Sequence, residues 1–209
     1  MKRLIKPSID YKPQQYLTIS RLYHLGSKDL SFFSLGENTD ISKESYDCQY
    51  LFLFLEGDGK ILSDKEMEVS CGDLYFSEKK KEIGLKGNNL TYLQIKWEEE
   101  KMTELIKAGE IFKLKDLIEY QEEAIVNLDI ASNDQTKFVL MAFDAGTSLD
   151  PHRAPGDALV FALEGSAEIG YEEDNFVISE GDVFRFDKNG LHSVKALTNF
   201  KMALLLTLA

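Results

Sequence analysis

The chain has 209 residues, 44% of them hydrophobic and 29% charged, which is enough for one large or two small packed domains. Its formal net charge of −12 argues against nucleic acid and anionic membranes as partners, because both require a cationic surface. No apolar stretch is long enough to span a bilayer, and no apolar run follows the basic N-terminus, so we expect a cytoplasmic protein.

The first half of the chain is rich in short β-strand signals. Runs of β-branched and aromatic residues over 16–23 and 30–35 predict two strands. The continuous apolar run over 50–55 fits a strand that is buried on both faces. We expect Glu56-Gly-Asp-Gly59 to end this strand in a hairpin-like turn. Further strands are expected at 60–62, 67–69, 74–76 and 90–97.

The composition changes between residues 98 and 122. Met102, Leu105 and Ile106 recur at helical spacing in the segment 98–108, and Gly109 follows at the C-cap position. A second short helix is expected at 114–120. The sequence therefore predicts a short helical linker between two halves.

Strand signals return after this linker. They lie at 124–130, 137–143, 158–163, 167–169, 175–179, 183–186, 192–194 and 200–208. Many short strands at regular spacing, with Gly and Asp at the turns, are typical of an all-β sandwich or barrel.

The two halves also repeat short sequence matches in the same order. The matches are Leu55-Glu56-Gly57 with Leu163-Glu164-Gly165, Gly72-Asp73 with Gly181-Asp182, and Leu90-Thr91 with Leu197-Thr198. The members of each pair are 108, 109 and 107 residues apart, respectively. A repeat of this length is the size of a domain, so it predicts a duplicated barrel rather than a solenoid.

Two groups of residues in the second half carry a family resemblance. Gly146, His152 and Gly165 form the first group, and Gly181, Asp187, Asn189 and His192 form the second. Their spacings resemble the two sequence motifs of cupins, with Asp187 in place of a proline. Residues 155–165 are also similar to a subset of small bacterial cupins. The resemblance implies two tandem jelly-roll β-barrels, a bicupin, with an N-terminal barrel over 1–97, a linker over 98–122 and a C-terminal barrel over 123–209.

The resemblance also implies a candidate metal site. Most metal-binding cupins hold their ion with three His and one Glu, and this sequence keeps His152 and His192 of that set. Ala154 and Ala158 stand at the other two positions and have no donor atom. A divalent ion such as Zn, Mn, Fe or Ni would need other groups to complete its coordination. The alternative is that the two imidazoles line a cavity and bind neighbouring groups or an anion.

Asp157 is the third candidate for ligand binding. Side chains alternate faces along a strand, so Asp157 points outward if Ala158 points inward. A turn at Pro155-Gly156 would relax this alternation and let Asp157 reach the cavity; otherwise Asp157 is a turn or capping residue. The third histidine, His24, lies outside both motifs and is interpreted as a surface or packing residue.

The N-terminal copy of the motifs contains no histidine. Counting from Gly57 and Gly72 places Glu44, Tyr46, Tyr50 and Ile83 at the positions of the metal ligands. We therefore expect this half to be a structural partner or a dimer-forming unit, in which Tyr46 and Tyr50 could line a small aromatic pocket.

Three functions remain open. The first is binding of a small organic ligand, such as a carboxylate or sugar acid, in the C-terminal barrel. The second is a metal-dependent dioxygenase, isomerase or lyase that uses His152 and His192 as ligands. The third is metal-free acid–base catalysis by one of these histidines. We expect the two barrels to pair within the chain, and a homodimer is a further option. Cys48 and Cys71 are expected to be reduced thiols.

Overall fold

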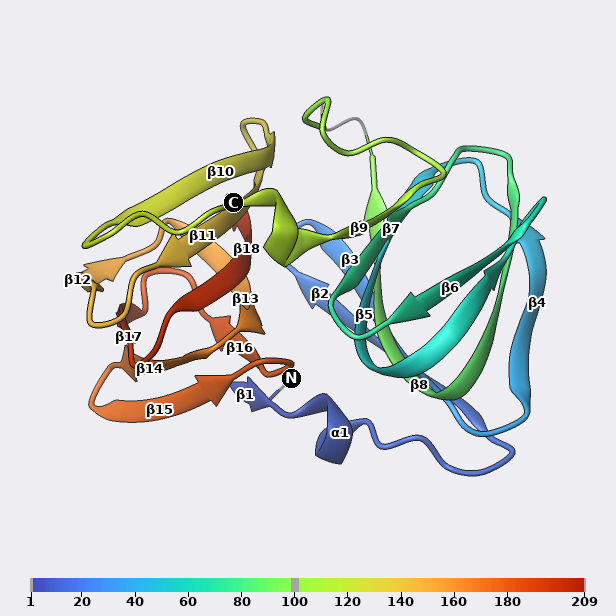
Figure 1. Ribbon diagram of the computed structural model, residues 1–209, viewed down its shortest axis with the longest axis horizontal. Helices are drawn as coiled ribbons and strands as arrows, with labels where there is room; N and C mark the ends of the chain where they lie inside the picture. Colours follow the sequence, from blue (N-terminus) through green and yellow to red (C-terminus); the bar gives the residue numbers. More distant parts are fainter. Residues whose placement is uncertain (1, 99–101, 209) are drawn as a thin grey trace.

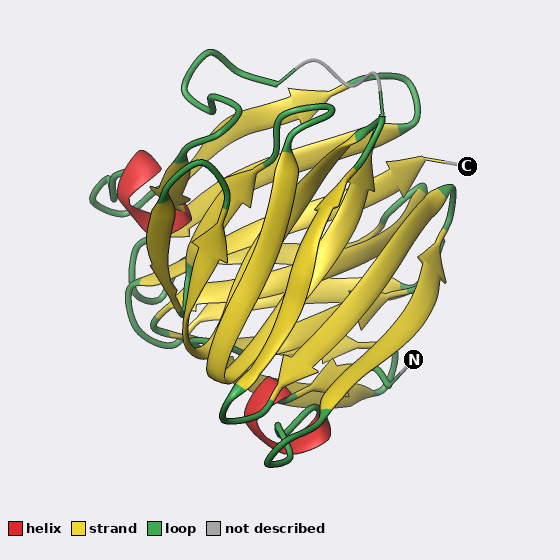
Figure 2. Cartoon of the chain, turned by 90° about the vertical axis from the view of Figure 1, so that its right-hand side faces the viewer, coloured by secondary structure: helices red, strands yellow, loops and turns green. Residues whose placement is uncertain are grey.

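The computed structural model describes residues 2–98 and 102–208, and the all-β prediction is confirmed. Figure 1 shows two groups of strands, one from each half of the chain. Within the described residues, helix is limited to α1 (Pro7–Asp10) and the single 3₁₀ turn η1 (Leu114–Leu117). Neither is long and apolar enough to cross a membrane. In the side view of Figure 2, strands therefore make up most of the molecule, and loops connect them.

The described residues form eighteen strands, β1 to β18. Those of the first half are β1 (Leu4–Ile5), β2 (Thr18–Leu25), β3 (Lys28–Leu35), β4 (Thr39–Ser45), β5 (Gln49–Leu62), β6 (Glu66–Ser70), β7 (Asp73–Phe76) and β8 (Glu82–Trp97). Those that come after them are β9 (Ile111–Lys113), β10 (Ile125–Ser132), β11 (Thr136–Phe143), β12 (Ser148–Arg153), β13 (Gly156–Glu164), β14 (Ser166–Tyr171), β15 (Asp174–Ser179), β16 (Val183–Phe186), β17 (Leu191–Ala196) and β18 (Phe200–Leu208).

The first half forms one eight-stranded antiparallel sheet. Its main path runs β2-β3-β8-β5-β7-β9, with β4 on β8 and β6 on β5. β5 and β8 are 14 and 16 residues long, and β5 contains register shifts between Phe54 and Asp58. Such bulges bend a strand and increase its twist, so these long strands can serve both walls of the folded sheet.

The second half forms two antiparallel sheets. The six-stranded sheet has the order β1-β16-β13-β18-β11-β10, and the four-stranded sheet has the order β12-β17-β14-β15. An apolar cluster with members from both sheets includes Val160, Ile169, Phe184 and Val194. These jelly-roll-like sheets are of the kind that the sequence predicts.

Strands β5 and β13 are buried on both faces, as the sequence predicts for 50–55. Along β13, Leu159 and Phe161 point into one cluster, whereas Ala158 and Val160 point into the other. The same alternation divides β5, where Leu53 and Phe52 belong to different clusters. Because side chains alternate along a strand, an unbroken apolar run is required when both faces are covered.

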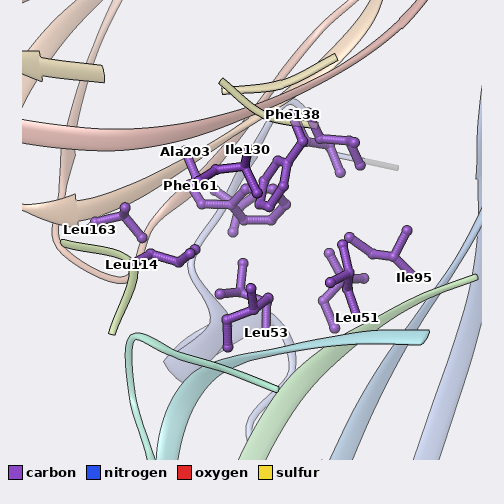
Figure 3. Packing of buried hydrophobic residues seen from close by; sticks show 14 of the residues in the cluster. Leu51, Leu53, Ile95, Leu114, Ile130, Phe138, Phe161, Leu163 and Ala203 are labelled. Carbon is purple, nitrogen blue, oxygen red and sulfur yellow. The ribbon is translucent and has the colours of Figure 1, made fainter. Parts of the chain in front are cut away.

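The outward faces of these two strands meet in a core shared by both halves. Figure 3 shows Leu51, Leu53 and Ile95 from the first half facing residues of the second half, among them Phe138 and Phe161. Each large apolar side chain buried in this way stabilises the fold by about 1.5–3 kcal/mol. The shared core therefore couples the packing of the two halves.

Two of the three sequence matches have the same local structure. Gly57 and Gly165 have φ of 75° and 73°, and Gly72 and Gly181 have φ of 83° and 88°. The N–H of Gly72 donates to the Phe54 carbonyl at 2.8 Å, and that of Gly181 donates to the equivalent carbonyl of the second half at 2.9 Å. The third match is not equivalent, because Leu90 is buried in β8 whereas Leu197 is 47% exposed in a turn.

Gly57 and Gly165 cannot be replaced without moving the backbone. A Cβ atom at Gly57 would lie 2.0 Å from the Asn89 carbonyl oxygen, and one at Gly165 would lie 1.9 Å from that of Asn199. Both glycines also adopt the left-handed conformation that other residues disfavour. The observed backbone path at these two positions therefore requires glycine.

Three expectations about the connections are wrong. Residues 56–59 form no hairpin turn, because β5 continues through them to Leu62 and absorbs Gly57 in its bulges. The linker helix over 98–108 is not formed by residues 102–108, which make turns and one bridge; residues 99–101 lie outside the described residues. The second expected helix, over 114–120, is reduced to η1, which follows β9 directly and buries Leu114 in the core.

The N-terminal strand crosses to the second half. β1 pairs with β16 in the six-stranded sheet, with Leu4 opposite Phe184. Lys6 forms an ion pair with Asp182 at 2.8 Å. β1 therefore belongs to the six-stranded sheet of the second half, just as β9, which follows residue 97, belongs to the sheet of the first half.

We expect Phe161→Ala to lower the free energy of unfolding by about 3–5 kcal/mol, because it leaves a cavity in the shared core. Trp97 is the only tryptophan and lies in the first half within the same core, so its fluorescence reports on coupling. The midpoint of guanidinium-induced unfolding, followed by Trp97 fluorescence, should fall in Phe161→Ala. Val177→Ala is the control, since Val177 is 53% exposed on β15. An unchanged Trp97 midpoint in Phe161→Ala would show that the halves unfold independently.

Candidate functional site

The structure brings His152 and His192 together. His152 lies on β12 and His192 on β17, and the two residues are partners in the register of these antiparallel strands. Their ring centroids are 4.3 Å apart, with an angle of 53° between the planes. In Figure 1, β12 and β17 lie at the end of the molecule that is remote from the first half. The two motif histidines therefore form a pair at the outer end of the second half.

The two imidazoles differ in exposure but share one hydrogen-bond pattern. His152 is exposed, whereas His192 is 6% exposed and stacks on Phe186 at 4.1 Å. The Nδ1 atom of each ring lies 2.9 Å from the carbonyl oxygen two residues earlier, Asp150 or Gly190. A carbonyl only accepts, so each Nδ1 carries the proton and each neutral ring keeps a lone pair on Nε2. Neither Nε2 atom has a hydrogen-bond partner among the described residues.

The environment of His192 favours its neutral form. Burial lowers the pKa of His192 below its usual value, and the neighbouring His152 lowers it further. The hydrogen bond to the Gly190 carbonyl acts in the opposite direction and is outweighed. The inner ring of the pair therefore acts at neutral pH as an acceptor through Nε2.

The donor set does not fit a resident divalent ion. Ala158 is buried in the apolar core of the second half, and Ala154 packs against that core, so neither position supplies a ligand. Within the part of the chain that the structure describes, no group of three or more His, Cys, Asp and Glu side chains is placed to hold a metal. Two imidazoles alone are fewer protein ligands than zinc or iron sites use.

The Asp157 side chain is engaged in the backbone of a turn. Its Oδ1 accepts a hydrogen bond at 2.9 Å from the N–H of Lys188, in the turn that leads to β17. This contact corresponds to the capping alternative from the sequence. Asp157 thus ties the start of β13 to the segment that presents His192.

The sequence did not indicate that Arg3 supports this end of the fold. Its guanidinium lies 3.8 Å from the centre of the Tyr171 ring, and its Nη2 donates to Asp187 at 2.8 Å. Burial acts to raise the pKa of Asp187, but the hydrogen bond from Arg3 and the charges of Arg185 and Arg3 outweigh it and lower that pKa. Tyr171 is the register partner of His192, so Arg3 braces the strand beside the histidine pair. The only sequence signal for this role of Arg3 was the basic N-terminus, which did not indicate that Arg3 would contact Tyr171 and Asp187.

The remaining candidates lie in the first half. Glu44, Tyr46 and Ile83 line a cavity inside this half. Tyr50 contacts the Tyr46 ring at 5.0 Å but is not part of the cavity wall. His24 is exposed and lies 2.7 Å from Asp29, as expected for a surface residue.

Comparison with known proteins supports the cupin superfamily. Residues 139–208, which include both motif histidines, match the cupin domain. The chain is 26% identical to a cupin 2 conserved barrel domain protein from Leptotrichia buccalis, with a TM-score of 0.83 over 98% of this chain and 95% of that one. None of the curated proteins matches the sequence.

More distant structures share the fold. A salicylate 1,2-dioxygenase variant from Pseudoaminobacter salicylatoxidans has a TM-score of 0.65 at 10% identity, covering 88% of this chain and 71% of that one. AerE from Microcystis aeruginosa has a TM-score of 0.57 at 13% identity, covering 95% and 97%. At these identities the likeness concerns the fold alone.

We expect the lowered pKa of His192 to make stability depend on pH. The unfolded chain binds a proton at His192 more readily than the folded chain does, so the free energy of unfolding falls as pH falls from neutral through the folded pKa. Thermal unfolding between about pH 7.5 and pH 5 should show this loss, and His192→Gln should reduce it. His24→Gln is the control, because His24 is exposed. An equal loss in His192→Gln and the unsubstituted protein would contradict the assignment.

Proposed function

We propose that the second half binds a small organic acid, such as a carboxylate or a sugar acid, at the pair formed by His152 and His192. One observation carries this proposal: two facing imidazoles have both Nδ1 atoms bonded to backbone and, among the described residues, both Nε2 atoms unpaired. A protonated Nε2 donates a charge-assisted hydrogen bond to a carboxylate. The exposure of His152 lets a ligand approach from outside.

The chemistry of the pair favours uptake of one proton with the acid. At neutral pH the buried ring is neutral, and a carboxylate that reaches Nε2 stabilises the protonated form of an imidazole. Arg153 follows His152 on β12 and adds positive charge, which Glu172 at 3.8 Å partly offsets. The negative charge of the bound acid therefore pairs with the imidazolium, so the protonated ring is not an isolated buried charge.

We also propose that the two halves are tandem cupin barrels, with bounds at 1–97, 98–122 and 123–209. The matching backbone conformations of Gly57 and Gly165 support this proposal, as do the matching backbone hydrogen bonds of Gly72 and Gly181. In this arrangement the shared core is the pairing surface of the barrels. A cytoplasmic location agrees with Cys48 and Cys71, which are free thiols.

The alternative function is a metal-dependent dioxygenase, isomerase or lyase. The unpaired Nε2 atoms favour it, because neutral imidazoles bound through Nδ1 to a carbonyl are the usual form of metal-ligating histidine. A salicylate dioxygenase is also among the structures that share the fold. The donor set argues against it, since Ala154 and Ala158 supply no ligand and Asp157 is bound to the Lys188 N–H.

For the acid, we expect acetate, benzoate or gluconate to shift the His152 and His192 side-chain signals in ¹H–¹⁵N NMR spectra. Affinity should fall as pH rises, because binding takes up a proton. Loss of a charge-assisted hydrogen bond in His152→Gln or His192→Gln should weaken binding about tenfold or more. His24→Gln is the matched control on the first half. Equal affinity for benzamide and benzoate would rule out an acid site.

For the metal, we expect no stoichiometric ion after incubation with Zn, Mn, Fe or Ni salts and removal of the excess. Two imidazoles hold such ions weakly when no further ligand joins them. Elemental analysis of the untagged protein measures the content, with His152→Ala and His192→Ala alongside. One ion per chain that is lost in both variants would support the metal-dependent alternative instead.

A further inference from the structure

Two crossing strands, β1 and β9, each complete the sheet of the half that they do not precede directly. β1 pairs with β16 in the second half, and β9 pairs with β7 in the first half (Figure 1). An ion pair accompanies each of them, between Lys6 and Asp182 at 2.8 Å and between Lys113 and Asp73 at 2.9 Å. The crossing strands and their ion pairs are therefore equivalent features of the two halves.

Only the first crossing strand carries a further set of side-chain contacts. Arg3 stands three residues before the ion-paired lysine of β1, and Glu110 has the same place before the ion-paired lysine of β9. Glu110 is exposed, and its side chain has no hydrogen bond or ion pair with any described residue. Arg3 contacts Tyr171 and Asp187. These contacts are therefore not part of what both sheets require, and they occur in the half that has the histidine pair.

Arg3 holds the turn between β16 and β17 at two points. Its guanidinium lies 3.8 Å from the centre of the Tyr171 ring, and its Nη2 donates to Asp187 at 2.8 Å. Asp187 begins the turn, and its carbonyl accepts the N–H of Gly190 at 2.9 Å. Gly190 packs directly on the Tyr171 ring, because a Cβ atom there would lie 2.4 Å from the tyrosine hydroxyl oxygen. One guanidinium thus contacts the residue that begins the turn and the ring against which the turn ends.

The end of this turn determines which nitrogen of His192 carries the proton. The carbonyl of Gly190 lies 2.9 Å from Nδ1 and accepts its proton, so Nε2 of the neutral ring is left as an acceptor. Phe186 holds one face of the imidazole at 4.1 Å and stacks on Tyr171 at 5.9 Å. Both the carbonyl and the ring that hold His192 therefore belong to residues packed on Tyr171, over which Arg3 lies.

We infer that Arg3 is a positioning residue for His192: it keeps the Gly190 carbonyl where that carbonyl holds the imidazole proton on Nδ1 and leaves Nε2 open to a ligand. Arginine suits this role because its planar guanidinium stacks on a ring while its N–H groups donate to a carboxylate. The inference rests on the proposed function only for the ligand that Nε2 receives. The site in the second half is thus complete only when β1 is in place.

Long-range ¹H–¹⁵N NMR spectra of the ligand-free full chain test this inference at a pH where the imidazoles are neutral. The unsubstituted protein should show His192 in the Nδ1–H form, with His192→Gln to assign the signal. Arg3→Met should add the Nε2–H form, because the Gly190 carbonyl is no longer fixed. Lys6→Met is the matched control, since it removes the ion pair with Asp182 from the same crossing strand. It should leave the spectrum of His192 unchanged.

Two results of these spectra would overturn the positioning role. One is a His192 signal that does not change in Arg3→Met. The other is an equal change in Lys6→Met, because it would show that docking of β1 alone determines the tautomer.

Benzoate provides a second readout. Its affinity should fall about 3- to 10-fold in Arg3→Met and stay unchanged in Lys6→Met, because only the first change releases the ring that presents Nε2. Equal benzoate affinity in Arg3→Met and the unsubstituted protein would contradict the positioning role. A lack of benzoate binding to the unsubstituted protein would instead refute the proposed acid site, and the spectra without ligand would still decide the role of Arg3.

Discussion

The structure depends on two strands, β5 and β13, that are buried on both faces. Each strand sends one set of apolar side chains into the core between the halves and the other set into the interior of its own half. The shared core is possible only because both strands have this double pattern. The shared core also covers the face of each strand that is directed toward the other half. A binding site in either half must therefore be reached from another side. The histidine pair and the cavity of the first half accordingly lie toward opposite ends of the molecule (Figure 1).

The second constraint is the corner at which the chain leaves β13. At Gly165 the chain passes from β13 in the six-stranded sheet to β14 in the four-stranded sheet, and the residue has a positive φ. A side chain there would collide with the Asn199 carbonyl, so the sheets can fold over the interior only with glycine. β14 then pairs with β17 and sets the position of His192 opposite Tyr171. A backbone requirement at one glycine thus determines where the His192 side chain is presented.

Sequence patterns predicted the parts of the fold that local chemistry determines. The apolar run over 50–55, the matching glycines at 57 and 165 and the pairing of His152 with His192 all depend on residue type and spacing. The turn at 56–59 was wrong because β8 offers backbone partners to β5 beyond Gly57, and these are distant in the sequence. The helical spacing of Met102 and Ile106 was misleading, because contacts with other segments compete with helix: Met102 bridges to Ala131.

The interiors of the two halves differ in how completely side chains fill them. In the second half, aromatic rings fill the interior, with Phe184 and Phe186 at 5.2 Å and Phe176 and Phe184 at 5.1 Å. Ala158 adds to this packing, so polar chemistry is displaced outward to the rim, where His152 is exposed. In the first half, the interior keeps a cavity whose lining includes Glu44 and Tyr46. Aromatic packing thus leaves the histidine pair of the second half at the rim, whereas the first half keeps polar side chains around a cavity inside it.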